Sequence, residues 1–155
     1  MPASQDCERL PPAPSGGVTA VRLAALPHRH VLTLPNQPAA VRLARETAEQ
    51  ALAEWGIGPR HPAVDPALLI LGELVTNSVR HAAARSPQVT VIYTAGRDCL
   101  AFAVHDRHPH QPPLIGASSG GLATVMELTH ELGGTAVVRA DADQQGKSIW
   151  ITLPL

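Results

Sequence analysis

The sequence is poor in aromatic residues and in lysine, and both shortages limit the fold and the partners that it can have. Aromatic residues make up 3% of the 155 residues, and Lys147 is the only lysine. A core with so few aromatics must be built from Ala, Val, Leu and Ile, which favours helices layered on a sheet. The formal net charge of -1 provides no broad cationic field, so we expect neither nucleic acid nor anionic lipid as a partner.

Cysteines and long apolar runs are scarce as well. Cys7 and Cys99 are the two cysteines, and their spacing matches neither a disulfide framework nor a zinc-ligand pattern. No apolar run approaches the length of a transmembrane helix, and the first residues lack the basic-then-apolar order of a signal peptide. We therefore expect a cytoplasmic protein with one core, for which 45% hydrophobic residues are sufficient.

Two parts of the chain differ in composition. Residues 1–25 are rich in Pro, Ser, Gly and Ala, and the stretch PPAPSGG within them would break any regular element, so we expect a flexible tail there. Residues 26–155 carry the regular patterns of a folded domain. We expect Asn36 and Asp65 to cap its first two helices.

The patterns in residues 26–155 predict an α/β fold of the two-layer, α+β sandwich kind. Apolar residues at three- and four-residue steps predict helices over 38–55, 66–84 and 122–132. Short β-prone runs predict strands over 31–34, 89–94, 100–106, 135–140 and 148–153. This order of elements implies one mixed β-sheet with helices packed on one face, and the first strand is expected at the edge of the sheet.

The second helix carries three polar residues at regular spacing. Glu73, Asn77 and His81 stand four residues apart, which places a carboxylate, a carboxamide and an imidazole along one stripe. Amide and phosphate oxygens suit Mg²⁺, and a carboxylate one turn away can take a proton from an attacking hydroxyl. Taken alone, such a stripe is more often an ordinary solvated face.

Four motifs in order resemble those of one protein family. ELVTNSVRHA resembles the N box of the GHKL (histidine-kinase-like) ATPase superfamily, especially in small bacterial anti-sigma-factor serine/threonine kinases. Further along, VHD resembles the first glycine box, GGLATV the second, and GKSIW the last strand. These segments are Glu73–Ala82, Val104–Asp106, Gly120–Val125 and Gly146–Trp150. One such motif is a weak signal, whereas four in the family's order are a strong one.

The resemblance implies a Bergerat-type ATP-binding fold, ATP and Mg²⁺ as cofactors, and a role for each matched residue. Glu73 would be the general base, Asn77 the Mg²⁺ ligand and Asp106 the reader of the adenine amino group. The backbone amides of the second glycine box would cradle phosphates, because they open a helix. The expected nucleotide-binding residues are Asn77, His81, Asp106, Ser119, Gly120, Gly121, Leu122 and Ser148.

The resemblance also implies the reaction and the partners. A kinase of this type transfers the γ-phosphate of ATP to a serine of an antagonist protein and binds a sigma factor, and a homodimer is compatible with it. Ser119 and His108 stand where the family usually has a glycine and a small residue. Two alternatives therefore stay open: a binding module of the same fold without catalysis, and a stand-alone histidine-kinase catalytic domain.

Three other motif readings compete with this one. A metal site at His105, Asp106, His108 and His110 is disfavoured, because Pro109 and the end of the strand keep the four side chains from converging. GASSG at 116–120 matches a nucleophile elbow but lacks the strand that must precede it. GKS at 146–148 matches the end of a P-loop, yet a strand follows where a helix should.

Overall fold

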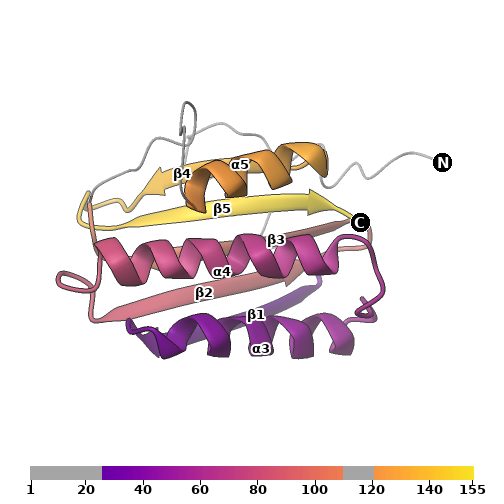
Figure 1. Cartoon of the computed structure of the whole chain (residues 1–155), viewed down its shortest axis with the longest axis horizontal. Helices are drawn as coiled ribbons and strands as arrows, with labels where there is room; N and C mark the ends of the chain where they lie inside the picture. Colours follow the sequence, from indigo (N-terminus) through magenta and orange to yellow (C-terminus); the bar gives the residue numbers. More distant parts are fainter. Residues whose placement is uncertain (1–25, 110–120) are drawn as a thin grey trace.

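In the computed structural model of the protein, which describes residues 26–109 and 121–155, three helices cover one face of a five-stranded sheet (Figure 1). The elements are β1 (His28–Pro35), α3 (Ala39–Glu54), α4 (Val64–His81), β2 (Gln88–Ala95), β3 (Cys99–Asp106), α5 (Gly121–Glu131), β4 (Thr135–Ala140) and β5 (Lys147–Pro154). The predicted two-layer sandwich is confirmed. The tail expected at residues 1–25 lies outside the described residues.

The strands lie in the order β1-β2-β3-β5-β4, so β1 is an edge strand as the sequence predicted. Every hydrogen-bonded pair is antiparallel, whereas a mixed sheet was expected. The physical reason is the place of β5. The helical connection through α5 links β3 to β4, and these two strands do run parallel, but β5 lies between them and pairs antiparallel with both.

The main core fills the space between the helices and the sheet. The side of α3 that faces the core is lined by small residues, and α4 contributes Ile70, Leu71, Leu74 and Val75, each at most 1% exposed. Small side chains let α3 approach the sheet closely, and the Tyr93 hydroxyl on β2 donates to the Ala44 carbonyl at 2.7 Å. Burial raises the pKa of Tyr93, so this hydroxyl stays a donor.

The starts of α3 and α4 differ from the predicted caps. Pro38 holds the N-cap position of α3 without a side-chain cap bond, and Asn36 turns inward instead. Ala63 holds the N-cap position of α4, which leaves Asp65 in the first helical turn. The ring of His61 accepts the Ala63 amide at 3.1 Å and so satisfies one of the open donors there.

The order of elements places the C-terminal end of β3, the first residue of β5 and the last turns of α4 next to each other. α5 packs against α4 beside them (Figure 1). Within the described residues, no helix is both long and apolar enough to cross a membrane.

Candidate functional site

The polar stripe of α4 lies within the helix as the sequence predicted. Glu73 and Asn77 are half-buried, while the next member of the stripe, His81, is exposed as the last residue of α4. Within the described part of the chain, no hydrogen bond or ion pair joins the side chain of Glu73 or Asn77 to another residue. Among the described residues, nothing therefore competes with a ligand for either oxygen-bearing group.

Glu73 lies against the start of α5. A methyl group added at Gly121 would overlap the Glu73 carboxylate, so the glycine leaves room for it. Leu122, the next residue, is half-buried and packs against the main core, which fixes the helix beside α4. The structure thus brings together the expected base and the first described residue of the expected phosphate cradle. Ser119 and Gly120 lie outside the described residues.

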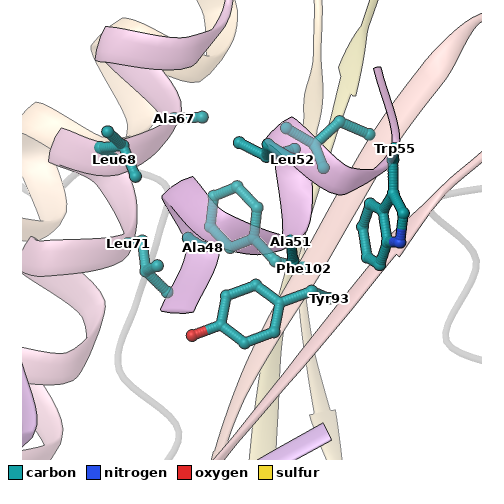
Figure 2. A pocket seen from close by; sticks show the side chains of 10 residues that line it. Ala48, Ala51, Leu52, Trp55, Ala67, Leu68, Leu71, Tyr93 and Phe102 are labelled. Atoms are coloured by element: carbon teal, nitrogen blue, oxygen red, sulfur yellow. The ribbon is translucent and has the colours of Figure 1, made fainter. Parts of the chain in front are cut away.

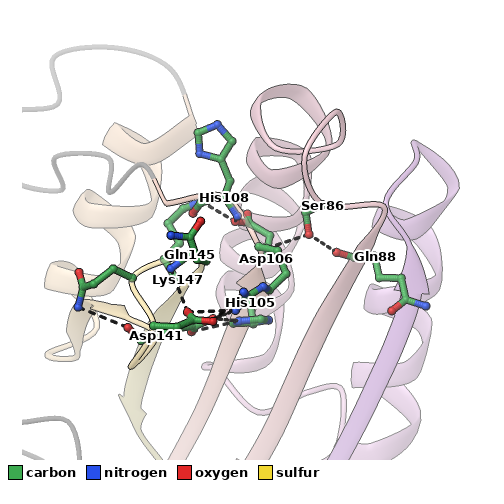
Figure 3. A network of polar contacts seen from close by, with 11 residues as sticks. Ser86, Gln88, His105, Asp106, His108, Asp141, Gln145 and Lys147 are labelled. Carbon is green, nitrogen blue, oxygen red and sulfur yellow. Dashed lines mark hydrogen bonds and ion pairs between the residues drawn. The ribbon is translucent and has the colours of Figure 1, made fainter.

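Asp106 ends β3 and is buried, with 4% of its surface exposed. Its Oδ2 accepts the Ser78 hydroxyl at 2.9 Å, which links β3 to α4. Its Oδ1 accepts the His108 amide at 3.1 Å and the Lys147 ammonium at 2.7 Å (Figure 3). Asp106, which is expected to bind the adenine amino group, therefore accepts hydrogen bonds from three donors.

Lys147 begins β5 directly opposite Asp106 in the sheet. Side chains of paired residues leave the sheet on the same face, and here that is the face covered by α4. The ammonium also lies 3.5 Å from the His108 carbonyl. A buried cation thus stands beside the Asp106 carboxylate.

Behind this pair, a chain of hydrogen bonds ties α4 to the loop before β2. The Asn36 amide group donates to Ser78 Oγ at 3.2 Å and to the Ser86 carbonyl at 3.0 Å. Ser86 Oγ accepts the Arg107 amide at 2.8 Å and donates to the Gln88 carbonyl at 2.6 Å (Figure 3). These contacts hold Ser78 and the end of β3 in fixed positions relative to each other.

The structure does not place Ser148 beside Asp106 and Lys147. It pairs with His105 across the sheet, one residue out of step with Lys147 and Asp106. Because successive strand residues point to opposite faces, Ser148 points away from α4. Lys147, and not Ser148, therefore has its side chain on the same face of the sheet as Asp106.

A second polar cluster lies beyond the other face of the sheet. His105 Nε2 is 2.9 Å from Asp141 Oδ2, and Arg107 forms ion pairs with Asp141 and Asp143 at 2.8 and 2.9 Å. The hydrogen bond from Arg107 holds the pKa of Asp143 below its ordinary value. His105 and Asp106 thus have separate partners. No group of three metal-ligating side chains occurs among the described residues, and His110 lies outside them.

A hollow between α3, α4 and the sheet lies within the apolar core (Figure 2). Its free volume is about 10 Å³, near the minimum that a single water molecule requires. Apolar and aromatic side chains line it, among them Leu52, Trp55, Leu68 and Phe102. Its apolar lining offers no charged group to a phosphate, so it does not suit the phosphates of a nucleotide.

Sequence reasoning missed the partners of Asp106. Ser78 lies inside the matched N box, but only the pairing of α4 with β3 shows that its hydroxyl meets Asp106. Lys147 stands out in the sequence only as the single lysine of the chain. Its contact depends on the β3–β5 register, which a single sequence does not show.

Comparison with known proteins agrees with this architecture. The family model described as a histidine kinase-like ATPase domain matches residues 34–152. The structure of the RsbU and RsbW domains of Rv1364c from Mycobacterium tuberculosis is 24% identical with a TM-score of 0.60, and the match covers 82% of this chain and 33% of that one. This chain thus spans about a third of that structure's length, and the likeness shows a shared fold.

A histidine kinase domain from the Erythrobacter litoralis EL346 blue-light activated histidine kinase is 17% identical, with a TM-score of 0.46. That match covers 79% of this chain and 62% of the other. No curated protein matches the chain.

Proposed function

Since the chain belongs to the family of histidine kinase-like ATPase domains, we propose that it binds Mg-ATP and transfers the γ-phosphate to a serine of a partner protein. The nucleotide site lies between α4, the start of α5 and the end of β3.

The observation that carries the proposal is the arrangement of three oxygen-bearing side chains in one region. Glu73 and Asn77 on α4 have no partner within the described residues, and the Glu73 carboxylate lies against Gly121. Asp106 stands at the end of the strand that α4 covers, joined to α4 through Ser78. A nucleotide spanning this region would meet a base-reading carboxylate at one end and a proton acceptor at the other.

The donor set suits Mg²⁺. A hard divalent cation prefers oxygen ligands and keeps several waters, and the Asn77 amide oxygen is a neutral ligand without a competing partner among the described residues. When bound with ATP, Mg²⁺ would offset negative charge on the phosphates. Asn77 would hold the ion, and the amide groups at the start of α5 would bind phosphate oxygens.

Glu73 would act on the attacking hydroxyl. The serine oxygen forms a bond to the γ-phosphorus as the bond from that phosphorus to the β,γ-bridging oxygen breaks, and ADP leaves with that oxygen. The serine proton passes to the Glu73 carboxylate. Its half-buried position beside Gly121 puts the carboxylate next to the start of α5, where proton transfer from a hydroxyl attacking a bound phosphate would need it.

The choice of partner depends on the N-box resemblance of Glu73–Ala82. This segment is similar to that of anti-sigma-factor kinases, which supports an antagonist protein as phosphate acceptor and a sigma factor as the bound protein. A homodimer is part of this proposal.

The experiment is phosphate transfer from γ-labelled ATP to proteins of the source cell. We expect one labelled protein with acid-stable phosphoserine. In the matched variant Glu73→Gln, which keeps the size of the side chain but removes the proton acceptor, labelling should fall at least about a hundredfold, while ATP affinity stays within about threefold. Undiminished labelling by Glu73→Gln would overturn the assignment of Glu73 as the general base.

A binding module without catalysis is the second candidate, and the buried contact of Lys147 with Asp106 favours it by occupying the base-reading group. Nucleotide binding without transfer to any protein would support this candidate. Acid-labile label would instead support a histidine-kinase catalytic domain.

A further inference from the structure

Lys147 changes the chemistry of the Asp106 carboxylate, which the proposed function assigns to recognition of the adenine base. Its ammonium lies 2.7 Å from Asp106 Oδ1, and the two side chains are 6% and 5% exposed. Both residues stand on the α4 face of the sheet, opposite each other at the ends of β5 and β3. Any base that approaches Asp106 therefore meets a cation as well.

Asp106 has little acceptor capacity left for a ligand. A carboxylate offers about four lone-pair positions. One accepts Ser78 Oγ on Oδ2, and two on Oδ1 accept the Lys147 ammonium and the His108 amide. A charged donor binds a carboxylate more strongly than a neutral amino group does. An adenine amino group therefore competes poorly with Lys147 for Asp106 Oδ1.

Lys147 in turn offers a donor. An ammonium has three N–H groups and no acceptor, and its two acceptors among the described residues are Asp106 Oδ1 and, at 3.5 Å, the His108 carbonyl. Position 6 of a purine carries an amino donor in adenine and a carbonyl acceptor in guanine. The Asp106–Lys147 pair can therefore meet either group.

We propose that Lys147 is a specificity-determining residue that lets the site take 6-oxo purine nucleotides nearly as well as ATP. This inference rests on the proposed nucleotide site. With Asp106 alone, a carbonyl at position 6 would face a second acceptor and be rejected, because both groups would lose their hydrogen bonds to water. With Lys147 present, the carbonyl finds a donor.

The test measures the affinity of the wild-type protein, by titration calorimetry with Mg²⁺, for ATP, GTP and purine riboside triphosphate, which lacks a group at position 6. We expect the three Kd values to lie within about tenfold of one another, which corresponds to about 1.4 kcal/mol. A loss of affinity of more than about tenfold for GTP, or on removal of the amino group, would overturn the inference. This series needs no variant to fold.

The variant Lys147→Met removes the cation and keeps the length of the side chain. We expect the Kd for GTP to rise at least about tenfold relative to that for ATP. Arg42→Met, which removes a cation from an exposed pair with Glu46, is the matched control and should leave the ratio unchanged. An unchanged ratio in folded Lys147→Met would also overturn the inference.

The outcomes separate the two proposals. Strict adenine preference in both wild type and Lys147→Met overturns the role of Lys147 and leaves the ATP site standing. Absence of binding of every nucleotide by the folded wild-type protein and by folded Lys147→Met overturns the proposed function, and the inference with it.

Discussion

Asp106 and Lys147 form an ion pair that is almost fully enclosed, with side chains 5% and 6% exposed. Removing two charges from water is costly, so such a pair adds little net stability over an apolar pair of the same size. Losing one partner is different, because it leaves an uncompensated charge in the interior. Replacing either residue should therefore affect folding as well as recognition of the nucleotide base.

We expect the two residues to be strongly coupled in unfolding experiments. Lys147→Met should lower the free energy of unfolding by about 3–5 kcal/mol, and Asp106→Asn should also be destabilising. The double variant should lose much less than the sum of the two, because no buried charge is left alone. Urea denaturation measures all three, with Arg42→Met as the exposed-pair control, expected to cost about 1 kcal/mol or less. Additive losses would contradict the buried pair.

At the scale of elements, the contact between α4 and the start of α5 sets the geometry of the expected phosphate end of the site. Gly121 begins α5 with the Glu73 carboxylate against it, in space that any larger residue would fill. The carboxylate is the end of a flexible side chain, so it can move aside at little cost to stability. Its position relative to a bound phosphate would then change.

We expect Gly121→Ala to separate activity from stability. The added methyl group displaces Glu73, so phosphate transfer should fall at least about tenfold, since small displacements of reacting groups are costly to rate. The free energy of unfolding should change by about 1 kcal/mol or less. Gly58→Ala is the matched control, because a methyl group there meets nothing within 4 Å. Equal activity of the two variants would contradict the role of this contact.

Elements were predictable from the sequence to the extent that a local pattern determines them. The apolar stripe of α4 and the β-prone runs predicted the helix and the strands. Four strands extend the predicted runs by about one to three residues at an end, β4 coincides with its prediction, and α4 begins two residues and ends three residues earlier than predicted. The caps at Asn36 and Asp65 were wrong. Asn36 is drawn inward by Ser78 and Ser86, partners far along the chain, and the helix at Asp65 is started earlier by His61.

At the scale of the whole molecule, the sheet order decides which residues meet. Asp106 and Lys147 are 41 residues apart and become neighbours because β5 inserts between β3 and β4. The resemblance assigned a role to Asp106 in advance. Lys147 also lies in a matched segment, but no role was assigned to it, because its contact with Asp106 comes from a strand register that one sequence does not display. Ser148 was expected among the nucleotide-binding residues, but a one-residue step along β5 places its side chain on the other face of the sheet.

Titration calorimetry with ATP measures whether a nucleotide binds where α4, α5 and β3 meet. With Mg²⁺ present, we expect a wild-type Kd in the range of about 1 μM to 1 mM, weakened at least about tenfold in Asn77→Ala. With EDTA, the gap between the two should close, because Asn77 acts through the ion. Gln50→Ala, an exposed amide on α3, should match wild type throughout. Equal affinities of wild type and Asn77→Ala in Mg²⁺ would show that Asn77 does not hold the ion, and no binding by the folded wild-type protein would show that this nucleotide site does not exist.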